Sequence, residues 1–210
     1  DYFALTETTA PGVNDAATDF FMTSKKQQLD IDVSGTTMDG VIVTRAATRI
    51  DIDATKLTTA MGSAFIIEEV IYHNRYTETK INHTEDPLST AGLARNQEDT
   101  DGDSTPDAYQ LTYTKDDAGM SSTISTGTDV WQGVLYGYEN FTESATDADY
   151  LDADAAIAAG ITVITVKGKY ANGIQMAHDI IFPKAIKPTR NHLYSISLEP
   201  LDIATDYGMV

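Results

Sequence analysis

Cysteine is absent from the 210 residues of this chain. Its absence excludes disulfide bonds, thiolate metal sites and a cysteine nucleophile. Long apolar runs are also absent, because no stretch approaches the roughly 20 consecutive apolar residues that a membrane-spanning helix needs. The sequence therefore favours a chain that folds by burying dispersed apolar side chains, without covalent cross-links.

Basic side chains are scarce. Lysine and arginine number 14 against 32 aspartates and glutamates, which gives a formal net charge of -18. A surface of this charge repels nucleic acids and anionic lipids, and it is compatible with divalent cations. We therefore exclude DNA and RNA as partners. The 41% of hydrophobic residues is ordinary for a folded globular protein, so the acidity is a property of the surface.

Recognised catalytic patterns are lacking. The four histidines are scattered without the spacing of a transition-metal site, and there is no P-loop, G-x-G-x-x-G or G-x-S-x-G. Neighbouring carboxylates such as Glu68-Glu69 are frequent, but so acidic a chain produces them by chance. A glycosidase built on two carboxylates stays open as an alternative without a nominated pair. We predict that the protein is not an enzyme. The histidines are His73, His83, His178 and His192.

Alternation of apolar and polar residues dominates the sequence and predicts β-strands. Residues 29–33 alternate strictly before a Ser-Gly turn, and residues 41–52 end in an alternating tail. Two apolar triplets, 65–67 and 70–72, flank Glu68-Glu69 and predict a long strand with a bulge or a change of face. The pattern is typical of an all-β fold, an antiparallel β-sandwich with long loops. Further strands are expected at 109–114, 130–138, 161–170, 178–182 and 192–199.

Helical signals are few. Residues 149–159 (DYLDADAAIAA) are followed by Gly160, and glycine in this stop position predicts one short helix. Between the strands, the stretch 84–107 is long, acidic and nearly free of large apolar residues. Loops of that length in compact domains are commonly functional, metal-ordered or mobile. Loops are expected at 6–18, 84–108, 116–129 and 142–150.

The sharpest chemical pattern lies in that acidic stretch, where the sequence reads DTDGDSTPD. Asp99, Asp101, Asp103 and Asp107 stand at relative positions 1, 3, 5 and 9, and the glycine permits a tight turn. Such carboxylates can converge on calcium, which accepts about 6–8 oxygen ligands. The loop resembles the calcium loops of thrombospondin type 3 repeats, and it departs from an EF-hand because Gln110 stands at position 12. We predict a structural calcium site; the alternative is a solvated acidic turn.

Two further patterns bear on recognition at the surface. Five aromatic residues at strand spacing could line a glycan site, but they are more typical of sheet faces and core. Asn82-His-Thr84 and Asn140-Phe-Thr142 match the N-glycosylation sequon, which carries no meaning if the protein is bacterial. The aromatic residues are Tyr109, Tyr113, Trp131, Tyr136 and Tyr138.

Three segments occur in a set order along the chain. They are residues 41–52 (VIVTRAATRIDI), preceded by DFFM at 19–22; residues 134–140 (VLYGYEN), followed by a strand at 162–170; and residues 190–198 (RNHLYSISL). Together they resemble the fimbrillin superfamily of Bacteroidetes, the group of FimA-type and Mfa-type pilins and Mfa-like proteins. Thr48 stands where that family usually has alanine.

The resemblance implies β-sandwich domains of transthyretin-like topology. It implies that residues 1–58 are the remainder of an N-terminal domain and residues 59–210 a C-terminal domain, with more of the protein before Asp1 and final strands after Val210. Family members are exported as lipoproteins to the outer membrane. Pilins of this class lose an N-terminal segment to a trypsin-like protease, and a neighbour's strand then fills the groove. An added strand covers apolar surface and pairs free backbone groups.

We therefore predict a structural or adhesive subunit of a bacterial cell-surface fimbria, located outside the cell or at the outer-membrane surface, with other fimbrial subunits as partners. The alternative is a secreted or lipid-anchored binding module that recognises a host glycan or protein. A shaft subunit needs a free donor strand, whereas a stand-alone binder can place its own terminus in the sheet. In either case, Ile196 and Leu198 are expected to belong to the core.

Overall fold

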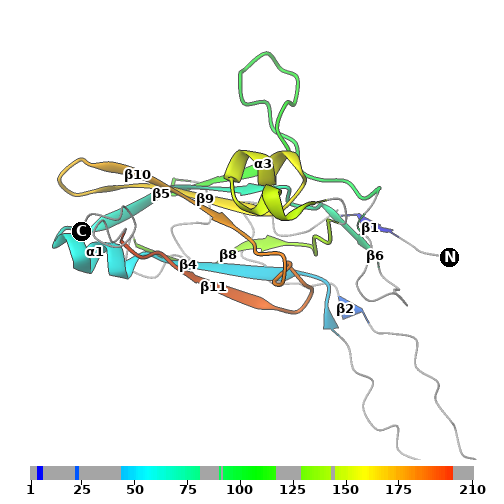
Figure 1. The fold of residues 1–210 in the computed structure, drawn as a ribbon, viewed down its shortest axis with the longest axis horizontal. Helices are drawn as coiled ribbons and strands as arrows, with labels where there is room; N and C mark the ends of the chain where they lie inside the picture. Colours follow the sequence, from blue (N-terminus) through cyan, green and yellow to red (C-terminus); the bar gives the residue numbers. More distant parts are fainter. Residues whose placement is uncertain are drawn as a thin grey trace, which may run out of the picture.

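The computed structural model describes residues 4–6, 22–23, 44–80, 90, 92–116, 129–142 and 145–200. Two sheets lie face to face and form a sandwich, as Figure 1 shows, so the all-β prediction is confirmed. The predicted strand at 29–33 lies outside the described residues. The first sheet has the order β10 (Gln175–Ile181), β9 (Val163–Tyr170), β5 (Phe65–His73) and β7 (Gln110–Thr114). The second has the order β11 (Leu193–Ser197), β4 (Thr48–Asp53) and β8 (Val130–Gly137).

Two short strand pairs accompany the sandwich in the described part of the chain. β1 (Ala4–Thr6) pairs with β6 (Glu78–Lys80), and β2 (Met22–Thr23) pairs with β3 (Thr44–Arg45). Every described strand pair is antiparallel except β11 with β4. The parallel pair arises because the chain crosses from β10 in the first sheet to the second sheet before it enters β11. The predicted antiparallel sandwich therefore has one parallel edge.

The core lies between the two sheets and follows the alternation of the strands. Phe65, Ile67, Val70 and Tyr72 of β5 point inward, and they pack with inward residues of β4 and β8 such as Ile50. Full burial of a side chain of this size contributes about 1.5–3 kcal/mol relative to exposure. The second sheet supplies Ile50, Ile52, Trp131 and Leu135 to the same cluster.

The predicted bulge in β5 is present, with a register shift against β9 between Ile67 and Glu69. Opposite this point, Gly168 of β9 faces the interior. A Cβ at Gly168 would lie 2.4 Å from the carbonyl oxygen of Ile66 and 2.6 Å from the ring atom Cζ of Phe65. Glycine is therefore required here because the Phe65 ring lies directly over the strand.

We expect Gly168→Ala to destabilise the fold by about 1–3 kcal/mol, or more if the strand cannot move, because overpacking forces backbone shifts. Urea unfolding monitored by tryptophan fluorescence measures the effect. Lys167→Ala, at the neighbouring outward position, is the matched control and should change the midpoint far less. Equal midpoints for the two variants would show that the strand shifts without cost.

Two helices and one 3-10 turn connect the strands in the described residues. The predicted helix is divided into η1 (Asp147–Tyr150) and α3 (Ala153–Ala158), because Asp152 caps the second part by accepting from the Ala155 amide at 2.9 Å. α3 lies on the outer face of the first sheet (Figure 1). Gly160 follows with φ 83°, as a helix stop requires. The helix α1 (Thr55–Met61), between β4 and β5, was not predicted.

The described residues on both sides of position 58 build one core, since β4 is the central strand of the second sheet. The division of the chain at residue 58 stays a prediction, because most of residues 1–43 lie outside the described part. Among the described residues, no helix combines the length and the apolar character that crossing a membrane requires.

Candidate assembly and metal-binding sites

Each of the three segments that carry the family resemblance contributes a strand to the second sheet. Residues 41–52 contain β4, residues 134–140 contain the end of β8, and residues 190–198 contain β11. β4 pairs with β8 on one side and with β11 on the other. Segments far apart in the sequence are therefore structural neighbours, and Glu139 of the second segment meets Arg190 of the third.

A buried ion pair joins Glu139 and Arg190, from the second and third of those segments. Their residues are only 2% and 7% exposed. The Arg190 Nε donates to the Glu139 Oε1 at 2.6 Å, and Arg190 also donates to the Thr79 hydroxyl at 3.2 Å. Thr79 in turn donates to the second carboxylate oxygen of Glu139 at 3.2 Å. This triad joins β6, the end of β8 and the segment that leads into β11.

Asn140, the residue after Glu139, is also held by hydrogen bonds to distant parts of the chain. Its side-chain amide donates to the Gly160 carbonyl oxygen and to the Thr162 hydroxyl, both at 2.9 Å. Its backbone amide donates to the Pro188 carbonyl oxygen at 3.1 Å. Asn140 is buried, so the sequon at this position holds the fold together and offers no exposed amide for a glycan.

Sequence reasoning missed a second buried polar group beside the triad. Arg75 is buried, and its Nε donates to the Tyr136 carbonyl oxygen at 2.6 Å. Asn74 adopts a φ of 55° and donates to the carbonyl oxygens of Ile157 and Ile161 at 2.9 and 2.8 Å. The two residues directly follow β5. In the sequence, an Asn-Arg pair at this place cannot be distinguished from an ordinary surface turn. Their contacts bind the first sheet to β8 and to the α3 region.

A third polar contact explains the alternation of charge in β4. Arg49 donates from Nε and Nη2 to the two carboxylate oxygens of Asp51, each at 2.7 Å, and Asp51 accepts from the Gly133 amide at 3.0 Å. The hydrogen bond to Asp51 raises the pKa of Arg49 above its usual value. Gly133 lies in a bulge of β8 with φ 71°. Asp51 therefore fixes the irregular pairing of β4 with β8.

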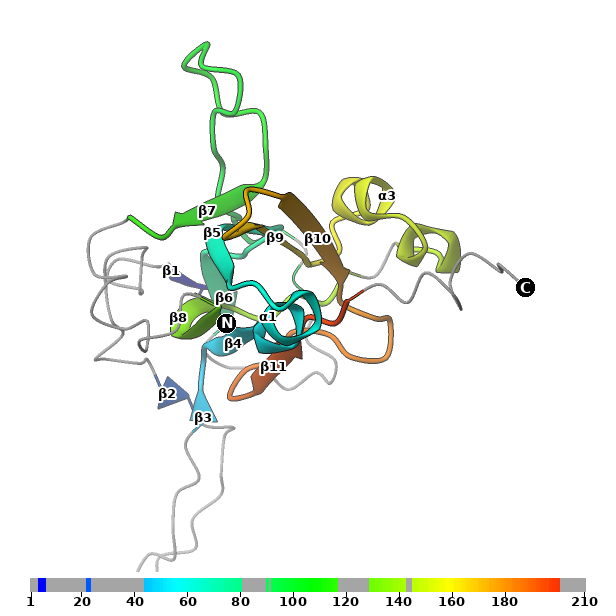
Figure 2. The same cartoon turned by 90° about the vertical axis from the view of Figure 1, so that its left-hand side faces the viewer.

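On the side of the sandwich where β10 and β11 lie, neither strand has a further strand beside it among the described residues. Both are terminal strands in their sheets, and Figure 2 shows them along the same side, opposite β7 and β8. The ring of Phe182, just after β10, contacts that of Tyr194 on β11 at 5.3 Å. Four apolar residues on this side pack against the core while remaining partly exposed. They are Met176 and Ile180 of β10 and Tyr194 and Ile196 of β11.

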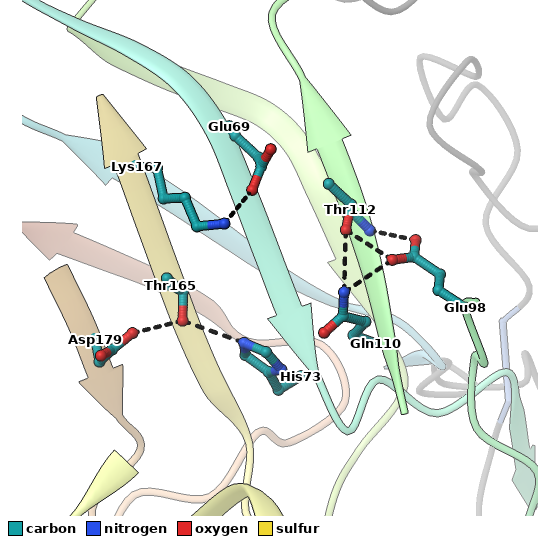
Figure 3. Close-up of polar contacts among 8 residues, drawn as sticks. All are labelled: Glu69, His73, Glu98, Gln110, Thr112, Thr165, Lys167 and Asp179. Carbon is teal, nitrogen blue, oxygen red and sulfur yellow. Dashed lines mark hydrogen bonds and ion pairs between the residues drawn. The ribbon is translucent and has the colours of Figure 1, made fainter. Parts of the chain in front are cut away.

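The three described histidines occupy separate places. The His73 Nε2 lies 3.1 Å from the Thr165 hydroxyl, whose proton goes to Asp179 at 2.6 Å (Figure 3). His192 contacts the Arg190 carbonyl oxygen through Nδ1 at 2.8 Å. His178 points inward from β10, and burial lowers its pKa, as it also does for His73. His83 lies outside the described residues.

The predicted calcium residues lie at the exposed tip of a hairpin that stands off the first sheet, drawn in green in Figure 1. Asp99, Asp101 and Asp103 each bring one carboxylate oxygen within 4.8 Å of the others. Asp107 is not part of this group; it accepts from the Thr100 amide and hydroxyl at 3.0 and 2.8 Å. The structure thus brings three of the four predicted ligands together.

The turn itself holds the first aspartate in its ionised form. Asp99 accepts from the amides of Gly102 and Ser104 at 2.7 and 2.6 Å. These hydrogen bonds, that from Gly102 first, lower the pKa of Asp99. An ionised carboxylate is the form that binds a hard cation. Calcium at this loop remains a prediction.

We expect calcium to raise the melting temperature by several degrees and to protect residues 92–109 from proteolysis, because a ligand that binds only the folded state stabilises it. Differential scanning fluorimetry and limited proteolysis in calcium and in EDTA measure both effects. Asp103→Asn should abolish the difference, while Asp154→Asn, an exposed acid on α3, should retain it. Identical cleavage of the loop in calcium and in EDTA would contradict the metal site.

The five aromatic residues considered for a glycan site do not form one surface. Trp131, Tyr113, Tyr136 and Tyr138 are buried. Only Tyr109 is substantially exposed, at 45%, and the Arg95 guanidinium lies 3.8 Å from its ring centroid. The interpretation of these residues as sheet faces and core is therefore confirmed for four of the five.

Comparisons with known proteins give similarity of shape alone. No protein-family model matches the chain, and no curated protein is significantly similar to it in sequence. Among solved structures, it is similar to the tip fimbrial protein Mfa3 from Porphyromonas gingivalis, in a form with a C-terminal truncation. The TM-score is 0.40 and the identity 14%, over 77% of this chain and 50% of that chain. The chain thus spans about half the length of that structure, and so distant a likeness assigns no family.

Proposed function

We propose that this protein is a structural or adhesive subunit of a bacterial surface fimbria, and that it joins a neighbouring subunit by strand addition on the side formed by β10 and β11. The observation that carries the proposal is that two terminal strands lie on one side of the sandwich, with a partly exposed apolar row between them. A strand laid along this side would cover that row and bond the outer backbone groups of either edge.

The backbone geometry supports this use of the edges. Directly after β10, the Phe182 amide donates to the Thr162 carbonyl oxygen. The even-numbered residues of β10 therefore direct their backbone amide and carbonyl groups toward β9, and the odd-numbered residues direct theirs away from the sheet. In β11, the Leu198 amide donates to the Asp53 carbonyl oxygen, so the outward residues are again odd-numbered. No described strand pairs with these outward groups.

The remaining parts of the proposal concern location and partners. A surface fimbria places the protein outside the cell, attached through a lipidated precursor at the outer membrane, with other fimbrial subunits as partners and without catalysis. Structural calcium at Asp99, Asp101 and Asp103 would stiffen the projecting hairpin. The sequence resemblance supports this setting.

Immunogold electron microscopy of the producing cells tests the fimbrial role. We expect gold along surface filaments for a shaft subunit, or at their ends for a tip subunit. Filaments that carry no gold would overturn the fimbrial role and favour a stand-alone module that binds a host glycan or protein.

Single cysteines test the assembly surface, because the natural chain has none. Ala177→Cys on β10 and Ser195→Cys on β11 each place a thiol at an exposed position of an edge strand. Asp154→Cys on α3 is the control. Coupling a bulky maleimide to either edge should prevent incorporation into filaments, whereas the labelled α3 variant should incorporate normally. Normal incorporation with both edges labelled would show that strands are not added on this side.

A further inference from the structure

The opposite edge of the first sheet, β7, is organised differently from β10. The Asn74 amide donates to the Tyr109 carbonyl oxygen at 2.7 Å, and the Lys115 amide donates to the Glu68 carbonyl oxygen at 3.0 Å. Odd-numbered residues of this segment therefore direct their backbone amide and carbonyl groups toward β5. Gln110 and Thr112 consequently direct their backbone groups away from β5, toward the side on which an incoming strand would bind.

Glu98 occupies that outward position. Its Oε1 accepts from the Thr112 backbone amide at 2.6 Å, and its Oε2 accepts from the Thr112 hydroxyl at 2.7 Å. The same Oε2 accepts from the Gln110 side-chain amide at 3.0 Å (Figure 3). One carboxylate thus binds the edge amide and the two neighbouring side chains on the outer face of the strand.

The backbone of Glu98 is fixed as well. Its amide donates to the Ala108 carbonyl oxygen at 2.9 Å, and its carbonyl oxygen accepts from the amides of Asp107 and Ala108 at 2.9 and 3.1 Å. These bonds close the base of the aspartate hairpin. The Gln110 amide is also used, since it donates to the Ala108 carbonyl oxygen at 3.1 Å. The base of the hairpin is therefore held beside the outer edge of β7.

No equivalent exists on the other side of the described sheet. None of the described side chains accepts from the outward amides of 177, 179 and 181 in β10, or of 193, 195 and 197 in β11. A side chain that takes an edge amide, together with a negative charge at the edge, is a means by which sheets avoid pairing with another chain. The two sides of this sandwich thus differ in their readiness to accept a strand.

We propose that Glu98 closes the β7 edge against a second copy of this chain. Two β7 edges would otherwise meet antiparallel, with Thr112 near the centre of the pairing. In the proposed fimbrial function, closure of the β7 edge leaves assembly to the side of β10 and β11, and this part of the inference rests on that function. The closure of the β7 edge by Glu98 does not depend on the fimbrial role.

Removal of the carboxylate in Glu98→Ala tests the proposal on the full chain. Hydrogen exchange of the Thr112 amide, followed by NMR at low concentration, should accelerate about tenfold or more, because a hydrogen bond to a charged acceptor is lost. Sedimentation velocity should show a dimer that grows with concentration and that the natural chain lacks. Glu69→Ala removes an acid of the same face that pairs with Lys167 at 2.7 Å, and it should change neither measurement.

A second substitution identifies the edge that is used. Proline at position 112 removes only an outward amide, which edge strands tolerate, and it blocks pairing there. The double variant Glu98→Ala/Thr112→Pro should therefore be monomeric. A dimer that survives the proline, or a Glu98→Ala chain that stays monomeric with unchanged exchange at Thr112, would overturn the proposal. Neither result depends on whether filaments form, so failure of the fimbrial role would be recognised separately.

Discussion

Glu139→Leu is expected to destabilise the protein by about 3–5 kcal/mol, because it leaves the Arg190 guanidinium buried without its counter-charge. Arg190 is only 7% exposed, and its guanidinium donates to Glu139 and to Thr79. Unfolding in urea, followed by circular dichroism, measures the loss. The carboxylate and the guanidinium belong to different sequence segments, so their separation should also loosen the entry to β11.

The double variant Glu139→Leu/Arg190→Met should recover much of that loss, because paired apolar replacements of a buried ion pair are often close to neutral. Lys184→Ala provides a matched surface control, since Lys184 and Asp147 form an exposed ion pair at 2.7 Å. This control should leave the unfolding midpoint unchanged. Equal and small effects of Glu139→Leu and Lys184→Ala would mean that water reaches the Arg190 site.

Leu198→Asp is expected to prevent cooperative folding. The side chain is 4% exposed and belongs to the cluster between the sheets, and a carboxylate placed there without a partner costs several kcal/mol. The loss would consume most of the 5–15 kcal/mol by which domains of this kind are stable. Soluble expression, near-ultraviolet circular dichroism and a thermal melt are the measurements.

The same substitution at two neighbouring positions calibrates this result. Ile196→Asp should be less damaging because Ile196 is only partly buried, at the open side of the sandwich. Ser197→Asp, at an exposed outward position on the same strand, should fold normally. A soluble Leu198→Asp chain with a sharp melting transition would show that this segment is not part of the core.

Local sequence patterns were sufficient for several elements. The alternation in 65–72 and the charged pair within it predicted β5 with its bulge, and the pairing with β9 shifts at that point. The alanine-rich stretch before Gly160 predicted a helix near α3. In each case, the signal depends on side chains adjacent in sequence, so periodicity reports it directly.

Local patterns failed where the preference was weak or the partner was distant. α1 contains three threonines in the sequence TKLTTAM and has no side-chain N-cap bond, so its helical preference is low. It forms because Leu57 is buried in the core and Gly62 ends it with φ 58°. The parallel pairing of β11 with β4 joins residues about 140 positions apart, such as Tyr194 and Ile50, and no local pattern encodes it.

The candidate sites divide in the same way. The spacing of aspartates marked the tip of the hairpin, but only folding placed Asp99, Asp101 and Asp103 together and turned Asp107 toward Thr100. Glu98 stands one residue before that pattern and drew no attention in the sequence. Its role depends on the outward amide of Thr112, which exists only once β7 is an edge.

The sequence by itself determined that this chain buries alternating strands, carries an excess of acid and has no cysteine chemistry, because these properties follow from composition and from the two-residue period of a strand. Tertiary structure alone decided which strands became edges, which carboxylates became buried partners of arginine and which one capped an edge. Those outcomes depend on sheet order, and sheet order is set by contacts between residues far apart in the chain.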